Sequence, residues 1–249
     1  MIKNFEELDK SITKIDMHSH TEYSHDCNTK LKEFGELLSK HKIGVSVTDH
    51  NEIKGSLLLK KMFPKLLVVP GIEVTSITSK DVLLYFDKHS ELEAFYNRHI
   101  SPNKKLNRRS NKVTLSTSYI LDMASDYNAL RAVPHPFMTL KGLAKTIKKD
   151  DSLLKNLDAV EVLNATKSKR NNIKSLEWAK KLDMPMIAGS DSHILSSLAN
   201  ALTLTNSNNP SDILEEIRKK QNSIVGDNAK FYSSLKGMGS IFKNKLKKS

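Results

Sequence analysis

Two histidines separated by a single residue, His18 and His20, are the first side chains whose spacing predicts chemistry. They follow Ile15-Asp16-Met17, a short run typical of a β-strand, where side chains two positions apart share a face and have Cα atoms about 7 Å apart. Two imidazoles placed in this way can bind one divalent ion at roughly 2.1 Å, with Asp16 as an acceptor that fixes the tautomer of one ring. The pattern therefore predicts a metal site.

Further histidines and acids lie at the ends of expected strands or in the loops after them. Asp191 and His193 repeat the spacing of His18 and His20, so they too can share a face. A single histidine in such a place is more often structural than a ligand, and the prediction therefore depends on the whole set. Cys27 is the only cysteine, which excludes an intrachain disulfide and a thiolate-rich zinc site. The set is His18, His20, His25, Asp26, Asp49, His50, Glu73, Asp81, His135, Asp191 and His193.

Alternating strands and helices must position these side chains. After the run at 15–17, apolar runs predict strands at 45–50, 66–69, 81–86, 129–133, 159–163, 184–188 and 201–205. Helical spacing predicts helices at 31–42, 54–63, 90–99, 116–127, 140–148, 167–182 and 211–221. This alternation favours parallel βα units, and seven or eight of them in about 225 residues fit a closed barrel better than two domains. The active site of a barrel lies at the C-terminal ends of its strands, where the polar side chains fall.

The formal charge of +12 is concentrated in an internal loop and in the C-terminal tail, two stretches without an acidic residue. We expect one barrel domain over residues 1–225 and a basic tail over 226–249. Apolar residues recur at helical spacing in the tail, which predicts an amphipathic helix that contacts nucleic acid or an anionic membrane weakly; a frayed, solvated terminus is the alternative. The stretches contain Arg98, Lys104, Lys105, Arg108, Arg109 and Lys112, and Lys230, Lys236, Lys243, Lys245, Lys247 and Lys248.

Several function classes have no support in the sequence. No run approaches the roughly 18 apolar residues of a membrane span, and residues 1–10 are too acidic and polar for a signal peptide. We therefore expect a cytoplasmic protein, and no obligate protein partner is evident. The chain has no GxxxxGK[ST] motif, so an ATPase is not supported. It also lacks GxSxG, a motif that metal-dependent hydrolysis does not need.

The motifs DMHSHTEYSHD, VTDHN, PGIEVTS, VPHP, AVEVLN and AGSDSH, in this order, resemble those of the PHP superfamily, named for polymerase and histidinol phosphatase. The resemblance covers residues 13–205. One HxH pair is common by chance, whereas the ordered series is specific. The resemblance implies an α/β fold, a distorted (β/α)7 TIM-like barrel. It also implies an enzyme that hydrolyses phosphate esters with two or three divalent ions. These ions are Mn, Zn or Fe, with Mg as a further option.

The ligands that the resemblance implies are divided among three metals. One member of the pair His25-Asp26 matches the family motif; we favour Asp26 as the ligand and leave His25 as a proton donor or an extra ligand. The first metal takes His18, His20, Asp191 and Glu73; Glu73 bridges to the second metal, which also takes His135; and the third takes His50, His193 and Asp26.

Position 81 departs from the family pattern. Members of the family usually have histidine at the start of the strand after the bridging Glu73, whereas this chain has Asp81. Aspartate can bind a hard cation and would shift the preference from zinc toward manganese or magnesium. The alternative is that Asp81 is a surface residue at the start of its strand.

The expected function is metal-dependent phosphoester hydrolysis in which a metal-bound hydroxide attacks phosphorus, with His25 and Asp49 as candidate catalytic residues. Two or three close cations neutralise the ester, orient it and lower the pKa of a bound water. The basic stretches favour a nucleotide or nucleic-acid substrate, bound by Arg108, Arg109 and Arg131. Two alternatives are a phosphomonoesterase of the histidinol-phosphate type, acting on a phosphorylated small molecule, and a non-catalytic binding module that keeps the fold.

Overall fold

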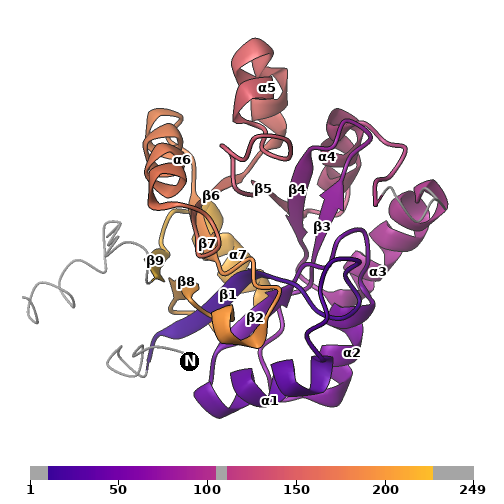
Figure 1. The fold of residues 1–249 in the computed structure, drawn as a ribbon, viewed down its shortest axis with the longest axis vertical. Coiled ribbons are helices and arrows are strands. Elements are labelled where there is room, and N and C mark those ends of the chain that lie inside the picture. Colours follow the sequence, from indigo (N-terminus) through magenta and orange to yellow (C-terminus); the bar gives the residue numbers. More distant parts are fainter. Residues whose placement is uncertain (1–10, 105–110, 227–249) are drawn as a thin grey trace, which may run out of the picture.

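The computed structural model describes residues 11–104 and 111–226, so Arg108, Arg109 and the basic tail lie outside the described residues. Helices surround a central set of strands (Figure 1). The strands are β1 (Thr13–Ser19), β2 (Gly44–Val47), β3 (Gly71–Thr75), β4 (Asp81–Tyr85), β5 (Leu130–Val133), β6 (Ala159–Asn164), β7 (Met186–Gly189), β8 (Ala201–Thr205) and β9 (Ser223–Gly226). The α-helices are α1 (Leu31–His41), α2 (Lys54–Met62), α3 (His89–Phe95), α4 (Thr117–Ser125), α5 (Ala144–Lys149), α6 (Lys169–Lys181) and α7 (Pro210–Arg218).

The described strands form two mixed sheets. The first has the order β2-β1-β8-β9, with β1 parallel to β2 and antiparallel to β8, and with β8 antiparallel to β9. The second has the order β3-β4-β5-β6-β7, in which β4 is antiparallel to both of its neighbours while β5, β6 and β7 are parallel. Single parallel bridges, Ser19 with Ser192 and His50 with Glu73, join the sheets.

The predicted distorted (β/α)7 TIM-like barrel is therefore wrong, although the α/β class is correct. In the described part of the chain no continuous ladder closes the two sheets into a barrel, and β4, β8 and β9 run antiparallel to their neighbours. A short hairpin causes the first reversal, because Ser76 N donates to Lys80 O at 2.8 Å and Ser79 has a left-handed φ of 62°. A chain that turns back within five residues cannot make the crossover that parallel pairing requires.

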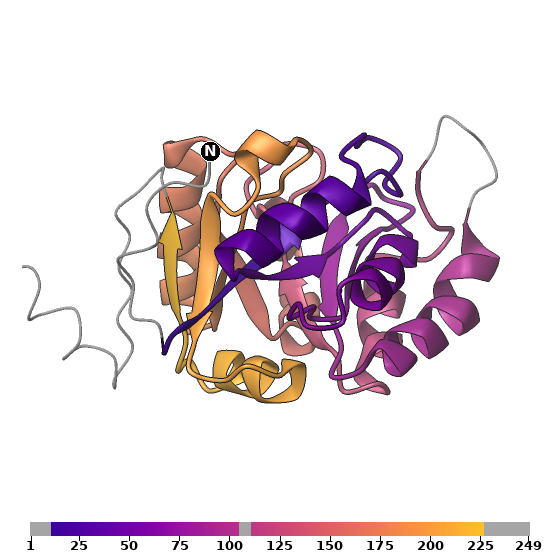
Figure 2. The same ribbon diagram turned by 90° about the horizontal axis from the view of Figure 1, so that it is seen from below.

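An apolar core lies between the two sheets. Ile15 and Met17 of β1 belong to the same buried cluster as Leu83 and Tyr85 of β4. Helix α7 contributes Ile213, Leu214 and Ile217 to this cluster and covers one end of the strands, at the bottom of Figure 2. Polar side chains occupy the opposite end, where β1, β2, β5 and β7 terminate.

β7 approaches β1 very closely at Gly189. A Cβ atom added to Gly189 would lie 2.4 Å from Cβ and 2.5 Å from the backbone N of His18. Asp191 N then donates to His18 O, and His20 N donates to Ser192 O at 3.0 Å. The absence of a side chain at position 189 thus lets the end of β7 join β1 beside the two candidate ligands.

None of the helices in the described ranges has both the length and the apolar character needed to cross a bilayer.

Candidate metal centre

Eight of the nine predicted ligands, all except Asp81, meet at the polar end of the strands. His18 is the penultimate residue of β1 and His20 directly follows the strand, Glu73 lies in β3, and the others occupy loops that follow strands. They form four overlapping groups of three in which the ligand atoms lie within 4.8 Å of one another. The groups are His18, Glu73 and His135; His18, His20 and Asp191; His20, Asp26 and His193; and His20, His50 and Glu73.

Glu73 lies at the centre of this cluster. Its Oε2 atom lies 3.2 Å from His18 Nε2, 3.4 Å from His20 Nε2 and 3.3 Å from His50 Nδ1, while Oε1 lies 3.2 Å from His135 Nε2. Its side chain is 1% exposed, so burial alone would raise its pKa. The charges of His50 and His18, with hydrogen bonds from His135 and His18, together outweigh the effect of burial and hold the pKa of Glu73 well below its usual value. An ionised carboxylate shared by four rings is the geometry expected of a bridging ligand.

Asp26 joins the cluster and His25 does not. Asp26 Oδ2 lies 3.3 Å from His193 Nε2 and 3.5 Å from His50 Nε2, and Ser24 donates to Asp26 Oδ1 at 2.7 Å. The side chain of His25 is half-exposed, and its Nδ1 lies 2.8 Å from Asn111 Nδ2. The geometry thus favours Asp26 over His25 at the third position.

Asp191 links the histidines to a lysine that sequence reasoning missed. Its Oδ1 lies 3.3 Å from His20 Nε2, and its Oδ2 lies 2.7 Å from Lys167 Nζ. Burial would raise the pKa of Asp191, but the charge of His18 and the contact with His20 lower it well below its usual value. Lys167 follows β6 directly, so the only available signal was its position after an expected strand.

Glu161 in β6 was also missed. It lies in the AVEVLN motif of the resemblance, but it is not among the predicted site residues. Its Oε1 lies 2.8 Å from His18 Nδ1, and its Oε2 accepts from the backbone N–H of His135 at 2.8 Å. Asp16, predicted to orient a ring, instead accepts from the backbone N–H groups of Ser190 at 2.8 Å and Ala199 at 2.9 Å. Glu161 therefore holds the ring of His18, while Asp16 fixes the backbone around β1.

Two candidate ligands have unusual backbone conformations. His135 has a φ of 30° and Asp191 a φ of 52°, both in the left-handed region. This region is unfavourable by roughly 1–2 kcal/mol for a residue with a side chain, and such strain tends to occur at functional sites. The surrounding hydrogen bonds, including the one from His135 N to Glu161, maintain it.

Asp49 and Asp81 are buried near the cluster but belong to none of its four groups. Asp49 accepts from both N and Oγ1 of Thr21 at 2.7 Å, and burial raises the pKa of Asp49 to about 7. Asp81 is 1% exposed, so the surface alternative for it is wrong. It accepts from Thr75 Oγ1 at 2.7 Å and pairs with Lys141 at 3.2 Å, and burial together with the charge of Glu73 raises its pKa to about 6. Catalysis by Asp49 and metal binding by Asp81 stay predictions.

Arg131 points to a different partner. Its Nε and Nη2 atoms donate to the two carboxylate oxygens of Asp158 at 2.8 and 3.0 Å. Arg131 lies at the start of β5 and Asp158 precedes β6, at the end opposite His135. This placement does not support the prediction that Arg131 binds substrate.

The donor set fits divalent cations. His18 Nε2 and His20 Nε2 face each other at 3.2 Å and both face Glu73, although a neutral imidazole has only one N–H. Among the described residues, the buried Nδ1 atoms of His20 and His135 have no hydrogen-bond partner. Imidazole nitrogens and carboxylates crowded in this way match the ligand preferences of zinc, manganese and iron.

Comparisons with known proteins agree with this site. A family profile described as PHP-associated matches residues 169–222, which include α6, the end of β7 and the segment of Asp191 and His193. An uncharacterized protein of Methanocaldococcus jannaschii is 28% identical over 193 residues, which are 76% of this chain and 68% of that protein.

Solved structures share the fold. A two-domain protein of Bacteroides vulgatus containing a predicted PHP-like metal-dependent phosphoesterase has a TM-score of 0.61 at 14% identity, covering 86% of this chain and 65% of that chain. The lesion-specific endonuclease PfuEndoQ of Pyrococcus furiosus has a TM-score of 0.64 at 16% identity, covering 94% of this chain and 66% of that chain. Together with the ordered motifs, these findings confirm the resemblance of the chain to the PHP superfamily.

Proposed function

We propose that the chain is a metal-dependent phosphoesterase that acts on a nucleotide or nucleic-acid phosphate ester. The observation that carries this proposal is the carboxylate of Glu73, which is buried and within 3.4 Å of ring nitrogens from His18, His20, His50 and His135. Such a set has no evident structural purpose, because burying several imidazoles around one carboxylate is unfavourable without a cation.

Separate groups of residues would hold each metal ion. His18, His20 and Asp191 would hold one ion, Glu73 would bridge it to a second ion at His135, and Asp26, His50 and His193 would hold a third. When bound, such ions neutralise a phosphate ester and make a nucleophile available at neutral pH.

Two further side chains suit the reaction. Lys167 Nζ lies 2.7 Å from Asp191 and is partly exposed, so its charge would add to the positive field beside the ester. The ring of His25 is half-exposed and its centroid lies 5.3 Å from that of His50, so His25 can exchange protons with solvent next to the cluster.

Two observations support a nucleic-acid substrate over a small phosphomonoester. The chain carries a net charge of +12, which favours polyanionic partners. The fold is similar to that of a lesion-specific endonuclease. The fold is also similar to that of Endonuclease Q in complex with a duplex that carries an abasic lesion, with a TM-score of 0.62 at 17% identity. Cleavage of phosphodiesters, and of duplex DNA with an abasic site, should therefore exceed hydrolysis of monoesters such as histidinol phosphate.

The test combines metal analysis with activity. Elemental analysis of the purified full chain should find about two or three equivalents of Mn, Zn or Fe per chain. Bis(4-nitrophenyl) phosphate, 4-nitrophenyl phosphate and an abasic duplex should be compared as substrates. E73Q should lose at least about 100-fold in turnover and most of the bound metal. E93Q, an exposed glutamate of α3, is the matched control and should behave as wild type.

Each outcome points to one of the candidate functions. Activity confined to monoesters would identify the small-molecule alternative. Bound metal without activity on any ester, and binding unaffected by E73Q, would support a binding module. Nucleic-acid affinity should also fall steeply between low and physiological salt, because bound counterions are released.

A further inference from the structure

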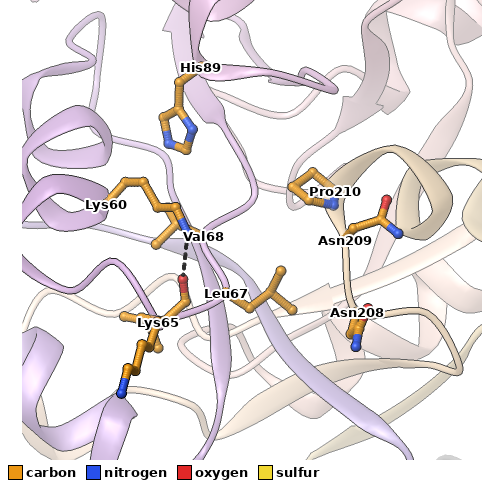
Figure 3. Close-up of a pocket in the computed structure, with 9 residues that line it drawn as sticks. Lys60, Lys65, Leu67, Val68, His89, Asn208, Asn209 and Pro210 are labelled. Carbon is orange, nitrogen blue, oxygen red and sulfur yellow. Dashed lines mark hydrogen bonds between the residues drawn. The ribbon is translucent and has the colours of Figure 1, made fainter.

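A second polar cavity lies at the end of the strands opposite the metal cluster. Figure 3 shows the side chains that line it: Lys60 of α2, His89 at the start of α3, and Asn209 and Pro210 at the start of α7, beside the segment 65–68. Its volume is about 300 Å³. None of the residues that line this cavity belongs to the four candidate metal groups.

Strand directions explain this separation. β4 is antiparallel to β3, with Tyr85 opposite Gly71, so the chain leaves β4 toward His89 at the end where β3 begins. β8 is antiparallel to β1, with Thr205 opposite Thr13, so the segment before α7 lies at the end where β1 begins. The metal ligands occupy the other ends of β1 and β3, and the cavity therefore forms a distinct site.

The lining is cationic and has no acid. Lys60 and His89 contribute nitrogen, whereas the amino group of Lys65 points away from them (Figure 3). No Asp or Glu is among the described residues that line the cavity. Lys60 Nζ donates to Pro64 O at 2.9 Å and to Leu66 O at 3.2 Å. These two bonds fix the ammonium group and leave one of its three donors for a ligand.

His89 is held neutral in this environment. Its Nε2 lies 3.5 Å from Ser56 Oγ. Burial, followed by the positive charge of Lys60, lowers the pKa of His89 to about 4. An anion between the two groups would accept a charge-assisted hydrogen bond from Lys60 and would favour the protonated form of His89.

The other wall of the cavity is apolar. Leu66, Leu67, Val68 and Pro210 line it, and the volume accommodates a ring or short chain in addition to one anionic group. We propose that this cavity is a binding site for a small organic anion, a phosphate or carboxylate group carried on an apolar body, and that it is separate from the metal centre.

Phenylphosphonate is the first probe, because it combines an anion with a ring and cannot be hydrolysed as an ester. It should be titrated into the full chain while the ring signals of His89, assigned with H89Q, are followed by NMR. The signals should shift and saturate. K60Q removes the charge of the ammonium group at the cavity and keeps a hydrogen-bond donor for the carbonyls of Pro64 and Leu66, and it should weaken the affinity at least about fivefold. K61Q removes an exposed lysine of α2 that does not line the cavity, and should bind as wild type.

Benzoate and benzyl alcohol complete the design. Tighter binding of phenylphosphonate than of benzoate would identify phosphates as the ligand class, and the reverse would identify carboxylates. Equal binding of neutral benzyl alcohol would overturn the requirement for an anion. The proposal is also overturned if the His89 signals do not respond, or if K60Q and H89Q bind phenylphosphonate as tightly as wild type in a calorimetric titration. These results do not depend on the phosphoesterase activity.

Discussion

Glu161 accepts a hydrogen bond from Nδ1 of His18 at 2.8 Å, on the side of the ring away from Glu73. Because a carboxylate can only accept, this contact places a proton on Nδ1 and leaves Nε2 to face the cluster. Among the described residues, Glu161 thus controls the orientation of a candidate ligand without belonging to any of the four metal groups.

Replacing Glu161 by Gln should weaken metal binding by about 10- to 100-fold, since the variant loses the charge that orients His18 and makes it more basic. Calorimetric titration of the chelator-stripped chain with Mn²⁺ or Zn²⁺ measures this. E177Q, an exposed position of α6, serves as the control. Equal affinities of E161Q and wild type would show that the contact has no role in metal binding.

Removal of metal should lower the melting temperature. Glu73 and Asp191 are buried among imidazoles, and a bound cation neutralises charges that are otherwise crowded together. At a metal concentration of 100 times Kd, one site adds about 2.7 kcal/mol to the free energy of unfolding. Differential scanning calorimetry with and without chelator, followed by re-addition of Mn²⁺, is the measurement. A melting temperature that is independent of metal would contradict a metal centre built from these residues.

Replacing Gly189 by Ala should destabilise the fold by about 1–3 kcal/mol, because the new methyl group would overlap the backbone of His18. The same change at Gly44 meets Leu67 Cδ2 at 2.8 Å, the end of a flexible side chain, and should be milder. Urea unfolding of both variants provides the comparison. If G189A is as stable as G44A, the contact between β7 and β1 is looser than the structure indicates.

Replacing Arg131 by Gln should affect stability and leave substrate binding unchanged. The variant breaks a half-buried bidentate pair with Asp158, which we expect to lower the free energy of unfolding by about 1 kcal/mol. R170Q removes an exposed arginine of α6 as a control. A raised KM together with normal stability would instead support the prediction that Arg131 binds the phosphate.

The stability of the fold should depend on His89 at acidic pH. The pKa of His89 is lowered from about 6.5 to about 4, so the unfolded chain binds the proton more readily than the folded chain. The contribution is therefore neutral above pH 6.5 and destabilising as the pH falls from 6.5 toward 4, by about 1 kcal/mol after allowance for solvent screening. Urea unfolding of wild type and H89Q at several pH values isolates this contribution, and the difference in stability between them should stop changing with pH above about pH 7.5. A constant difference across the range would exclude the titration of His89 as its cause.

Local sequence patterns predicted the elements better than their pairing. The strand expected at 201–205 is β8, and α1 and α2 each end one residue before the predicted limit. The apolar run at 66–69 was misleading, since only Val68 makes a bridge, with Val45, and β3 begins after Pro70. Strand direction depends on contacts between distant segments and on the hairpin before β4, so spacing alone could not reveal it.

The sequence predicted the ligands at the ends of strands but not the residues that orient them. Polar side chains after apolar runs marked the ends of strands, and the fold brings His18, Glu73 and Asp191 together. Glu161 was not predicted because it lies within a buried strand rather than at a strand end. An acid among apolar residues in such a strand nevertheless indicates a polar partner. Asp49 and Asp81 accept hydrogen bonds from Thr21, in the loop after β1, and from Thr75, the last residue of β3. These pairings leave no pattern in the sequence.

Because four rings share one carboxylate at Glu73, occupancy of one ion position alters affinity at its neighbours. An ion beside His18 and His20 would withdraw electron density from the same oxygen that faces His50. Successive equivalents of metal should then bind with unequal, mutually dependent constants, and the coupling factor must be the same in either order of loading. The ions would thus bind with negative cooperativity.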